Sequence, residues 1–315
     1  CLFVVSLVLA LAILAGCASP EARQQRRLQG LKPISGSSLG DVGLTTVWEK
    51  NLSDRPDKTS DVEIVAAYLC ETLVLLATAE NQIWAFDRMT GASQWVTQLP
   101  QPLKVEPTYF DTRLYCVCGN QLHVVDARGA DVLAGIFPFS VSKPLLVVDD
   151  YIYVPSSDGR LHKVEKARLN DLWKSFSRGT SIISGAPILL EGMLIFGTMD
   201  GQVTGLDRIG GGHRLDIKGF GPISGSIVTD GQYIYFGSSD YHMYCYSLTS
   251  NPVWNTVTQG IMVLPPVLAG DTLYADLVGA GLVSLARKNG NINWTNPAIR
   301  AFVAAGSARV FALAG

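Results

Sequence analysis

Short apolar segments recur along the chain after residue 47, and turn-forming residues separate them. Examples are LVLLATA at 73–79, YIYVPSS at 151–157 and YIYFGSS at 233–239. The segments are rich in β-branched and aromatic residues, and their apolar positions do not follow the 3.6-residue period of an amphipathic helix. The pattern therefore predicts short β-strands and no helices in this part of the chain.

Each apolar segment is followed by a tight turn and a second strand. Asn, Asp-Gly and similar residues tolerate the positive φ angles of two-residue hairpins. They occur here as Asn81, Asn120, Asp158-Gly159, Asp200-Gly201 and Asp240-Tyr241. A further turn, with Gly91, Gly129 or Gly290, leads to a third strand. This strand often carries a tryptophan, as at Trp95, Trp173, Trp254 and Trp294.

The second strands align as an internal repeat. They are NQIWAFD (81–87), NQLHVVD (120–126), GRLHKVE (159–165), GQVTGLD (201–207), YHMYCYS (241–247) and AGLVSLA (280–286), spaced 39, 39, 42, 40 and 39 residues apart. A repeat of about 40 residues with several antiparallel strands is typical of a propeller blade, whose two apolar faces are buried by neighbouring blades. The sequence predicts an all-β fold, a β-propeller of four-stranded antiparallel blades, with six complete repeats here and seven or eight in the intact chain.

The predicted propeller spans residues 47–315. We expect Trp48, in TTVWEKNL, to belong to an outlying strand that completes the last blade. The final segment, AGSARVFALAG at 305–315, opens a seventh repeat that we expect to be truncated. Two segments, RPDKTSD (55–61) and KARLNDLWKSFSRG (166–179), are predicted to be irregular insertions that could contact a partner.

The segment AFDRMTGASQW at 85–95 resembles the tryptophan-docking motif of quinoprotein-type, or PQQ-like, propellers. The motif is Ala-x-Asp, two residues, Thr-Gly, three residues and Trp, and it is matched by Ala85, Asp87, Thr90, Gly91 and Trp95. The resemblance implies that the indole lies between successive blades and that its N–H donates to a backbone group. It also implies that the Asp and the Thr-Gly pair hold the turn. Other repeats match in part, and the second repeat lacks the tryptophan.

The first 16 residues, CLFVVSLVLALAILAG, carry no charge. They are short for a membrane-spanning helix, which needs about 20 residues, and fit a secretory signal whose n-region is missing. The segment Leu14-Ala15-Gly16-Cys17 resembles a bacterial lipobox. This resemblance implies a lipid on Cys17, and Ala18 after it favours sorting to the outer membrane. A secretory signal with an incidental cysteine is the alternative.

Residues 17–46 are predicted to form the lipid anchor and a flexible tether with a reach of roughly 30 Å. A lipobox, a tether and a PQQ-like propeller together resemble the BamB-like family of outer-membrane lipoproteins. The resemblance implies a non-catalytic scaffold on the periplasmic face of the outer membrane, without a cofactor. Its partners would be the BamA-like periplasmic domains of the β-barrel assembly machinery. The alternatives are a propeller that binds a small ligand or peptide and, in another class, a quinone-dependent dehydrogenase.

Charge and side-chain chemistry narrow these alternatives. With 25 basic and 27 acidic residues the net charge is −2, so no basic field for nucleic acid is present. Asp87, Asp126 and Asp207 recur once per repeat, which predicts turn acceptors and not a convergent site. The histidines, His123, His162, His213 and His242, lie in different repeats, and we expect no acidic neighbours of the kind that a metal site needs. No catalytic, cofactor-binding or metal-binding residue is predicted.

Cysteines are few and none are adjacent in sequence, whereas resemblance to the quinone-dependent dehydrogenases would imply an adjacent Cys-Cys pair. Strand alternation directs Cys116 and Cys118 to one face of a sheet, where free core thiols are favoured over a strained bridge. Cys70 and Cys245 lie in apolar strands and are interpreted as core residues. Pairing among these four thiols stays open.

Overall fold

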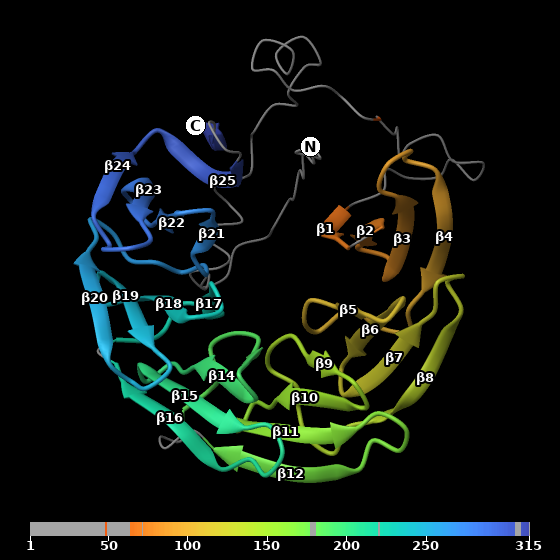
Figure 1. The fold of residues 1–315 in the computed structure, drawn as a ribbon. Coiled ribbons are helices and arrows are strands. Elements are labelled where there is room, and N and C mark those ends of the chain that lie inside the picture. Colours follow the sequence, from red (N-terminus) through yellow and green to blue (C-terminus); the bar gives the residue numbers. More distant parts are fainter. Residues whose placement is uncertain are drawn as a thin grey trace. The chain divides into compact units, whose positions relative to one another are not determined.

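The computed structural model describes Trp48 and residues 64–70, 72–176, 181–219, 221–305 and 310–314. These residues contain twenty-six strands and no helix (Figure 1). It follows that none of them forms a helix long and apolar enough to cross a membrane. The predicted signal, Cys17 and the tether lie outside the described residues, as does the segment 55–61.

The strands form six four-stranded sheets, each in chain order, and a final hairpin. We number the sheets blades 1 to 6. Neighbouring strands in the sheets pair antiparallel, as between β2 and β3 or β18 and β19. The prediction of an all-β chain made of four-stranded antiparallel blades is confirmed.

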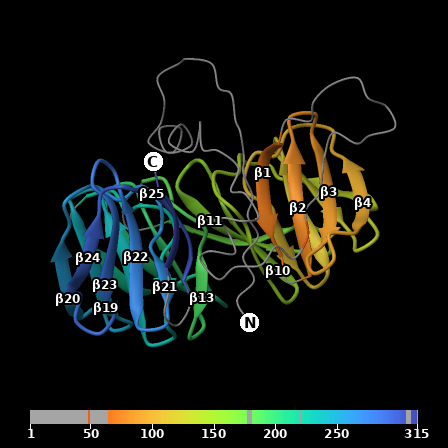
Figure 2. The ribbon, with the colours of Figure 1, turned by 90° about the horizontal axis from the view of Figure 1, so that it is seen from above.

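The described chain divides into two compact units, residues 1–103 with 109–134 and residues 104–108 with 135–315. The first unit contains blade 1, whose four strands lie side by side in Figure 2, and most of blade 2. The bounds in blade 1 are β1 (Ile64–Leu69), β2 (Leu73–Thr78), β3 (Gln82–Asp87) and β4 (Ser93–Gln98). Those in blade 2 are β5 (Thr108–Phe110), β6 (Arg113–Cys118), β7 (Gln121–Val125) and β8 (Asp131–Ile136).

The second unit contains blades 3 to 6 and the final hairpin. Blade 3 is β9 (Leu146–Val148), β10 (Tyr151–Pro155), β11 (Arg160–Glu165) and β12 (Asp171–Phe176); blade 4 is β13 (Ile188–Leu190), β14 (Met193–Gly197), β15 (Gln202–Asp207) and β16 (His213–Lys218). Blade 5 is β17 (Val228–Thr229), β18 (Tyr233–Ser238), β19 (His242–Ser247) and β20 (Pro252–Val257). Blade 6 is β21 (Val267–Ala269), β22 (Thr272–Leu277), β23 (Gly281–Ala286) and β24 (Ile292–Asn296), and the hairpin is β25 (Ile299–Ala305) and β26 (Val310–Ala314).

The predicted hairpin turns close the two central strands of each blade. Positive φ angles occur at Asn81 (63°), Gly159 (82°), Gly201 (83°) and Tyr241 (70°), as the turn residues predict. In blade 2 the positive angle belongs to Gly119 (64°), one residue before the predicted Asn120. Glycine takes this angle without strain, so it displaces the asparagine from that role.

A β-bulge recurs where the outer strand begins. Between Ala85 and Phe86, for example, the register shifts so that Ala85 pairs with Trp95 and Phe86 with Ser93, leaving Gln94 extra. Blades 3 to 6 repeat the shift, with Trp173, Leu215, Trp254 and Trp294 in the position of Trp95. A bulge re-aims the side chain that follows it. It therefore sets the position from which each outer strand directs its large side chain toward the next blade.

The core lies between successive blades within each unit. In the first unit, Leu75 and Ala85 of blade 1 and Cys116 of blade 2 are fully buried in one cluster. In the second unit, similar clusters join blades 3 and 4, 4 and 5, and 5 and 6. The central strands are consequently covered on both faces and show no alternation of burial, which is why their sequences are continuous apolar runs.

Candidate functional site

The motif at 85–95 holds a turn, as the resemblance implied. Asp87 Oδ1 accepts hydrogen bonds from the Thr90 hydroxyl at 2.8 Å, from the Thr90 amide at 2.7 Å and from the Met89 amide at 3.0 Å. These bonds, led by the Thr90 hydroxyl, hold the pKa of the Asp87 carboxyl below its ordinary value of 3.8. Asp126 and Asp207 accept amide hydrogen bonds in the equivalent turns. The three carboxylates thus have the predicted role of turn acceptors.

The turn glycine makes room for an indole. Gly91 has φ of +70°, and a Cβ on it would lie 2.5 Å from the Trp48 ring. Gly211 and Gly290 have φ of +72°, and a Cβ on either would lie 2.9 Å from Trp173 or 2.4 Å from Trp254. Glycine is needed at these positions for its backbone angle and for its missing side chain.

Three of the indoles complete the predicted hydrogen bond. Trp48 Nε1 donates to the Arg88 carbonyl, Trp173 Nε1 to the Ile209 carbonyl and Trp254 Nε1 to the Arg287 carbonyl, each at 2.9 Å. All three acceptors lie in the turn of the facing blade. Trp48 therefore docks on blade 1 as the other tryptophans dock on their neighbours, whereas the strand predicted around it falls on residues that are not described.

Trp95, the tryptophan of the best-matched motif, does not make this bond. Its ring is 9% exposed, and its Nε1 is buried without a hydrogen-bond partner. The turn that it faces runs from Asp126 to Gly129 and is one residue shorter than the turn from Asp87 to Gly91. The predicted bond is wrong at this position because the shortened turn supplies no carbonyl within reach.

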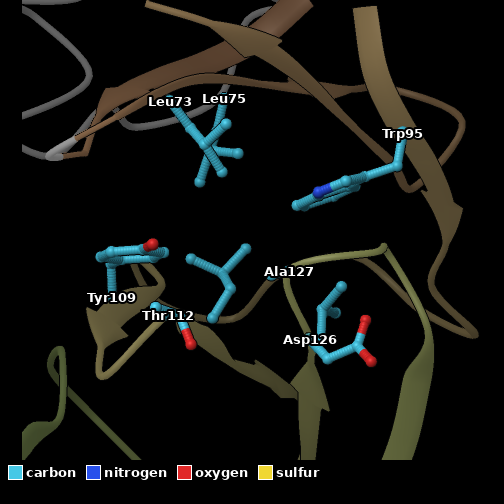
Figure 3. Close-up of a pocket in the computed structure, with 9 residues that line it drawn as sticks. Leu73, Leu75, Trp95, Tyr109, Thr112, Asp126 and Ala127 are labelled. Carbon is cyan, nitrogen blue, oxygen red and sulfur yellow. The ribbon is translucent and has the colours of Figure 1, made fainter.

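A narrow crevice remains beside the unpaired indole (Figure 3). Leu73 and Leu75 of β2 lie on one side of it, and Asp126 and Ala127 lie on the other. The crevice has no room for a water molecule, so solvent cannot satisfy the Trp95 N–H there. The unpaired Trp95 N–H therefore destabilises the seam between blades 1 and 2, and the crevice beside it is not a ligand site.

The second repeat has Leu133 at the position of the docking tryptophan, and the turn that follows in blade 3 has a leucine in place of the glycine. Leu169 occupies the turn position of Gly91: its amide donates to Glu165 O at 2.8 Å, as the Gly91 amide does to Asp87 O at 2.9 Å. Leu169 keeps a positive φ of 53°. Its side chain lies against Gly135 of β8, where an added Cβ would be 2.5 Å from Leu169 Cδ1. In this seam the turn residue therefore contacts a glycine of the outer strand, whereas in the seams where a tryptophan docks a turn glycine contacts the indole.

Residues 166–179 were predicted to be an irregular insertion, and this is wrong for the part that the structure describes. Residues 166–169 form the turn just described, and Asp171–Phe176 form β12, which pairs with β11.

An ionic network crosses one seam between blades. Arg287, after β23 of blade 6, donates to Asp230 Oδ2 at 2.5 Å and to Asp271 Oδ1 at 2.7 Å. The Tyr235 hydroxyl of blade 5 also donates to Asp230 Oδ2, at 2.9 Å. This network and the Trp254 hydrogen bond attach the same two blades.

The histidines do have acidic neighbours, contrary to expectation. His123 Nδ1 lies 2.9 Å from Asp131 Oδ2, and His162 Nδ1 lies 2.9 Å from Asp171 Oδ2. The aspartates begin the outer strands β8 and β12, so the hairpin brings each one back to a histidine eight or nine residues earlier. Among the described residues, no three such side chains gather in a group that could hold a metal ion. Each histidine is paired with one carboxylate within its own blade.

Ser156, His162 and Asp171 form a chain of polar contacts with the residue types of an acyl-transfer triad. His162 Nε2 lies 3.2 Å from Ser156 Oγ. Ser156 is fully buried, however, and its one hydroxyl proton has two acceptors within its own hairpin, Asp158 and the Arg160 carbonyl at 3.0 Å. A nucleophile must reach its substrate, and this hydroxyl is enclosed within its own hairpin.

Four cysteines are described, and none of them forms a disulfide. Cys116 and Cys118 both pack into the cluster between blades 1 and 2, as the alternation predicted. Burial raises the pKa of the Cys118 thiol to about 11 and that of Cys245 to about 12, and it raises the pKa of Cys116 further. Thiols held neutral in this way are poor nucleophiles.

Apolar side chains project from turns between the third and outer strands. Ile209, between β15 and β16, is 80% exposed, and Met89, between β3 and β4, is 50% exposed. Neither residue contributes to the cores described above. Sequence reasoning did not identify these positions as surface features, although each directly follows the turn Asp-Arg pair.

Comparisons with known proteins agree with this architecture. Residues 79–296 match the family model described as outer membrane protein assembly factor BamB. None of the curated proteins compared matches the chain. The crystal structure of BamB from Moraxella catarrhalis is similar with a TM-score of 0.58 and 16% identity, over 71% of this chain and 73% of that one.

The computationally designed Ika8 protein has a TM-score of 0.68 and 12% identity, with 82% of each chain covered. At these identities the two structures bear on the fold alone, which is that of a β-propeller. The family model spans more than two thirds of the sequence, and on that ground the chain belongs to the BamB family.

Proposed function

We propose that this chain is a non-catalytic scaffold lipoprotein that assists the assembly and insertion of β-barrel proteins at the periplasmic face of the outer membrane. The observation that carries the proposal is the match of residues 79–296 to the BamB family. The lipobox resemblance at Cys17 supports the anchor. Its partners would be BamA-like periplasmic domains of a β-barrel assembly complex.

The side chains best placed for chemistry are occupied by structural contacts, which supports a scaffold. Asp87 and its equivalents accept turn amides. Ser156 is enclosed, and the Cys116 and Cys118 thiols are buried. The protein therefore offers partners a set of turns held by packed sheets, which is how repeat scaffolds bind.

Ile209 is a good probe for the partner surface because it is the more exposed of the two apolar turn residues. Apolar groups at this exposure gain most from burial against a partner. Met199, in the turn between β14 and β15, provides a matched control because it is 49% exposed and lies at the other end of β15.

The test is affinity isolation of the full-length lipoprotein from detergent-solubilised envelopes. We expect the β-barrel assembly complex to be recovered with wild-type protein and with Met199→Lys, and to be lost with Ile209→Lys. Cys17→Ser should remove the lipid mass and release the protein from the membrane fraction. Consistent absence of the complex from the wild-type sample would refute the proposal. Stabilisation by a small ligand, or quinone absorbance, would then favour the corresponding alternative.

A further inference from the structure

The turn between β15 and β16 of blade 4 contains two glycines that the fold does not require. The turn runs from Asp207 to Gly212 and includes three glycines in succession. Gly211 is required, because its φ is +72° and an added Cβ would lie 2.9 Å from Trp173. Gly210 and Gly212 have no positive φ. An added Cβ would lie 3.9 Å from Asp207 at Gly210 and within 4 Å of no described atom at Gly212.

Turns of the same form in blades 1 and 6 carry side chains at these two positions. The amide of the first turn residue donates to the carbonyl of the sixth at 2.7 Å in blade 4 and at 2.8 Å in blades 1 and 6. The positions of the two open glycines are occupied there by other residues: Thr90 and Ala92 in blade 1, and Asn289 and Asn291 in blade 6. Glycine loses the most conformational freedom on folding, so glycine at a position that accepts a side chain lowers stability. The fold therefore gives no reason for Gly210 and Gly212.

The glycine at position 210 also leaves a main-chain donor unpaired. In blade 1 the Ala92 amide donates to Thr90 Oγ1 at 3.3 Å, and the equivalent pair in blade 6 makes the same kind of bond at 3.1 Å. Gly210 has no side chain that could accept such a bond. The exposed Gly212 amide has no acceptor among the residues that the structure describes. The turn of blade 4 consequently presents a free N–H group to the surroundings.

The neighbours of this free amide define the ligand that it fits. Ile209 is the most exposed of the large apolar side chains described, at 80%, and its carbonyl is held by Trp173 Nε1. Asp207 Oδ1 accepts hydrogen bonds from the Ile209 and Gly210 amides, each at 2.9 Å. Because this carboxylate already occupies the amides that could hold an anion, a second anion is disfavoured. The Gly212 amide therefore fits a neutral carbonyl with an apolar group beside it.

We propose that the turn of blade 4 binds an extended main-chain segment of a partner protein, whose carbonyl accepts the Gly212 N–H and whose apolar side chain covers Ile209. Every residue of a polypeptide carries such a carbonyl. Two main chains approach to hydrogen-bonding distance most closely where no Cβ stands between them, which accounts for both open glycines. The identity of the partner, a BamA-like periplasmic domain, rests on the proposed function. The contact itself rests on the turn.

The first experiment separates binding from stability. Gly210→Thr combined with Gly212→Ala gives blade 4 the residues of the blade 1 turn at these positions. We expect this variant to keep the Tm of the wild type or to raise it by up to about 3 °C. In affinity isolation of the full-length lipoprotein from detergent-solubilised envelopes, it should recover at least tenfold less assembly complex. Asn289→Thr combined with Asn291→Ala introduces the same side chains into blade 6, and this matched control should leave the recovery unchanged.

The second experiment identifies what lies against the turn. The photoreactive residue p-benzoylphenylalanine replaces Ile209 in the full-length lipoprotein, and adducts formed in envelopes are identified by mass spectrometry. We expect an adduct with the BamA-like subunit that disappears when Gly210→Thr and Gly212→Ala are also present. The same photoreactive residue in place of Lys288, the equivalent position in blade 6, should give no such adduct.

The two experiments have outcomes that would overturn the proposal. A lower Tm of the blade 4 variant would show that the fold needs the two glycines. Unchanged recovery, or the same loss in the blade 6 control, would show that the partner does not approach this turn. The absence of any adduct from position 209, or an adduct with a second copy of the chain, would also overturn it. A glycine-dependent adduct with a different protein, without recovery of the assembly complex, would contradict the proposed function and leave the contact at the turn standing.

Discussion

The unpaired indole of Trp95 gives a sharp test of how the seams between blades are stabilised. The perturbation is Trp95→Phe, compared with Trp254→Phe. Both changes remove the pyrrole part of an indole that faces a turn glycine, so the loss of packing is broadly shared. They differ in the hydrogen bond, because Trp254 Nε1 donates to Arg287 O at 2.9 Å and Trp95 Nε1 donates to nothing.

The magnitude follows from that difference. Loss of a made hydrogen bond costs about 1 kcal/mol, and removal of a buried unpaired donor recovers about 1–3 kcal/mol. The two variants should therefore differ by about 2–4 kcal/mol in the free energy of unfolding, with Trp95→Phe the more stable. We expect the lower end, because Trp254 is half-buried whereas Trp95 is 9% exposed and loses more apolar contact. A difference of about 2 kcal/mol corresponds to roughly 3–4 °C in Tm for a chain of this size.

The assay is equilibrium urea unfolding followed by far-UV circular dichroism and by tyrosine fluorescence, with coincidence of the two transitions as the check on two-state behaviour. Trp173→Phe serves as a second control and should behave like Trp254→Phe, since its Nε1 also donates at 2.9 Å. A complementary variant replaces Ala127-Arg128 with the tripeptide Arg88–Thr90, which lengthens the facing turn and should stabilise the protein. Equal destabilisation by all three Trp→Phe changes would refute the reasoning.

Three further predictions concern the turn glycines, the carboxylates and the thiols. Gly290→Ala should cost about 1–3 kcal/mol more than Gly270→Ala in the free energy of unfolding, because both residues have positive φ but an added Cβ would lie 2.4 Å from Trp254 at Gly290 and near no described atom at Gly270. Thermal unfolding of the two variants measures the difference, and equal costs would show that backbone strain alone matters. Because the pKa of Asp87 is lowered in the fold, its contribution to stability is present above pH 3.8 and is lost as the pH falls through the folded pKa. Asp87→Asn should therefore lower the urea midpoint at pH 7 and reduce the decrease of that midpoint between pH 7 and acid pH; an unchanged decrease would contradict this. Cys116 and Cys118 should resist iodoacetamide at pH 8 until urea unfolds the chain, and labelling of the native protein, read by mass spectrometry, would disprove their burial. Because the raised pKa of Cys118 favours the neutral thiol in the fold, its contribution to stability is complete below about pH 9 and declines as the pH rises toward about 11.

The repeat could be predicted because the residues that define it interact within a single hairpin. The period of about 40 residues, the turn glycines and the aspartate that accepts turn amides all act within one hairpin, so a short stretch of sequence is enough to reveal them. Asp87 and Gly91 behave as their pattern predicted.

The errors concern contacts between segments that are distant in sequence or joined through a hairpin. The unpaired Trp95 depends on the length of a turn some 30 residues later, where Asp126-x-x-Gly129 lacks one residue of the earlier pattern. The pairing of His162 with Asp171 depends on the register of β11 and β12. Both signals are visible in the sequence once the pairing of strands is known, but neither is visible in one repeat alone. The exposure of Ile209 depends on what the surrounding chain leaves uncovered, and no local pattern contains that information.

The leucine in the turn of blade 3 limits how the chain could gain or lose modules. Deleting blade 2 would bring Trp95 against Leu169, whereas Trp48, Trp173 and Trp254 each face a glycine at this position of the turn. Such a deletion would not be tolerated unless a second change made room for the indole. Duplication or loss of modules in this lineage should therefore have proceeded through segments cut so that both partners of a seam move together.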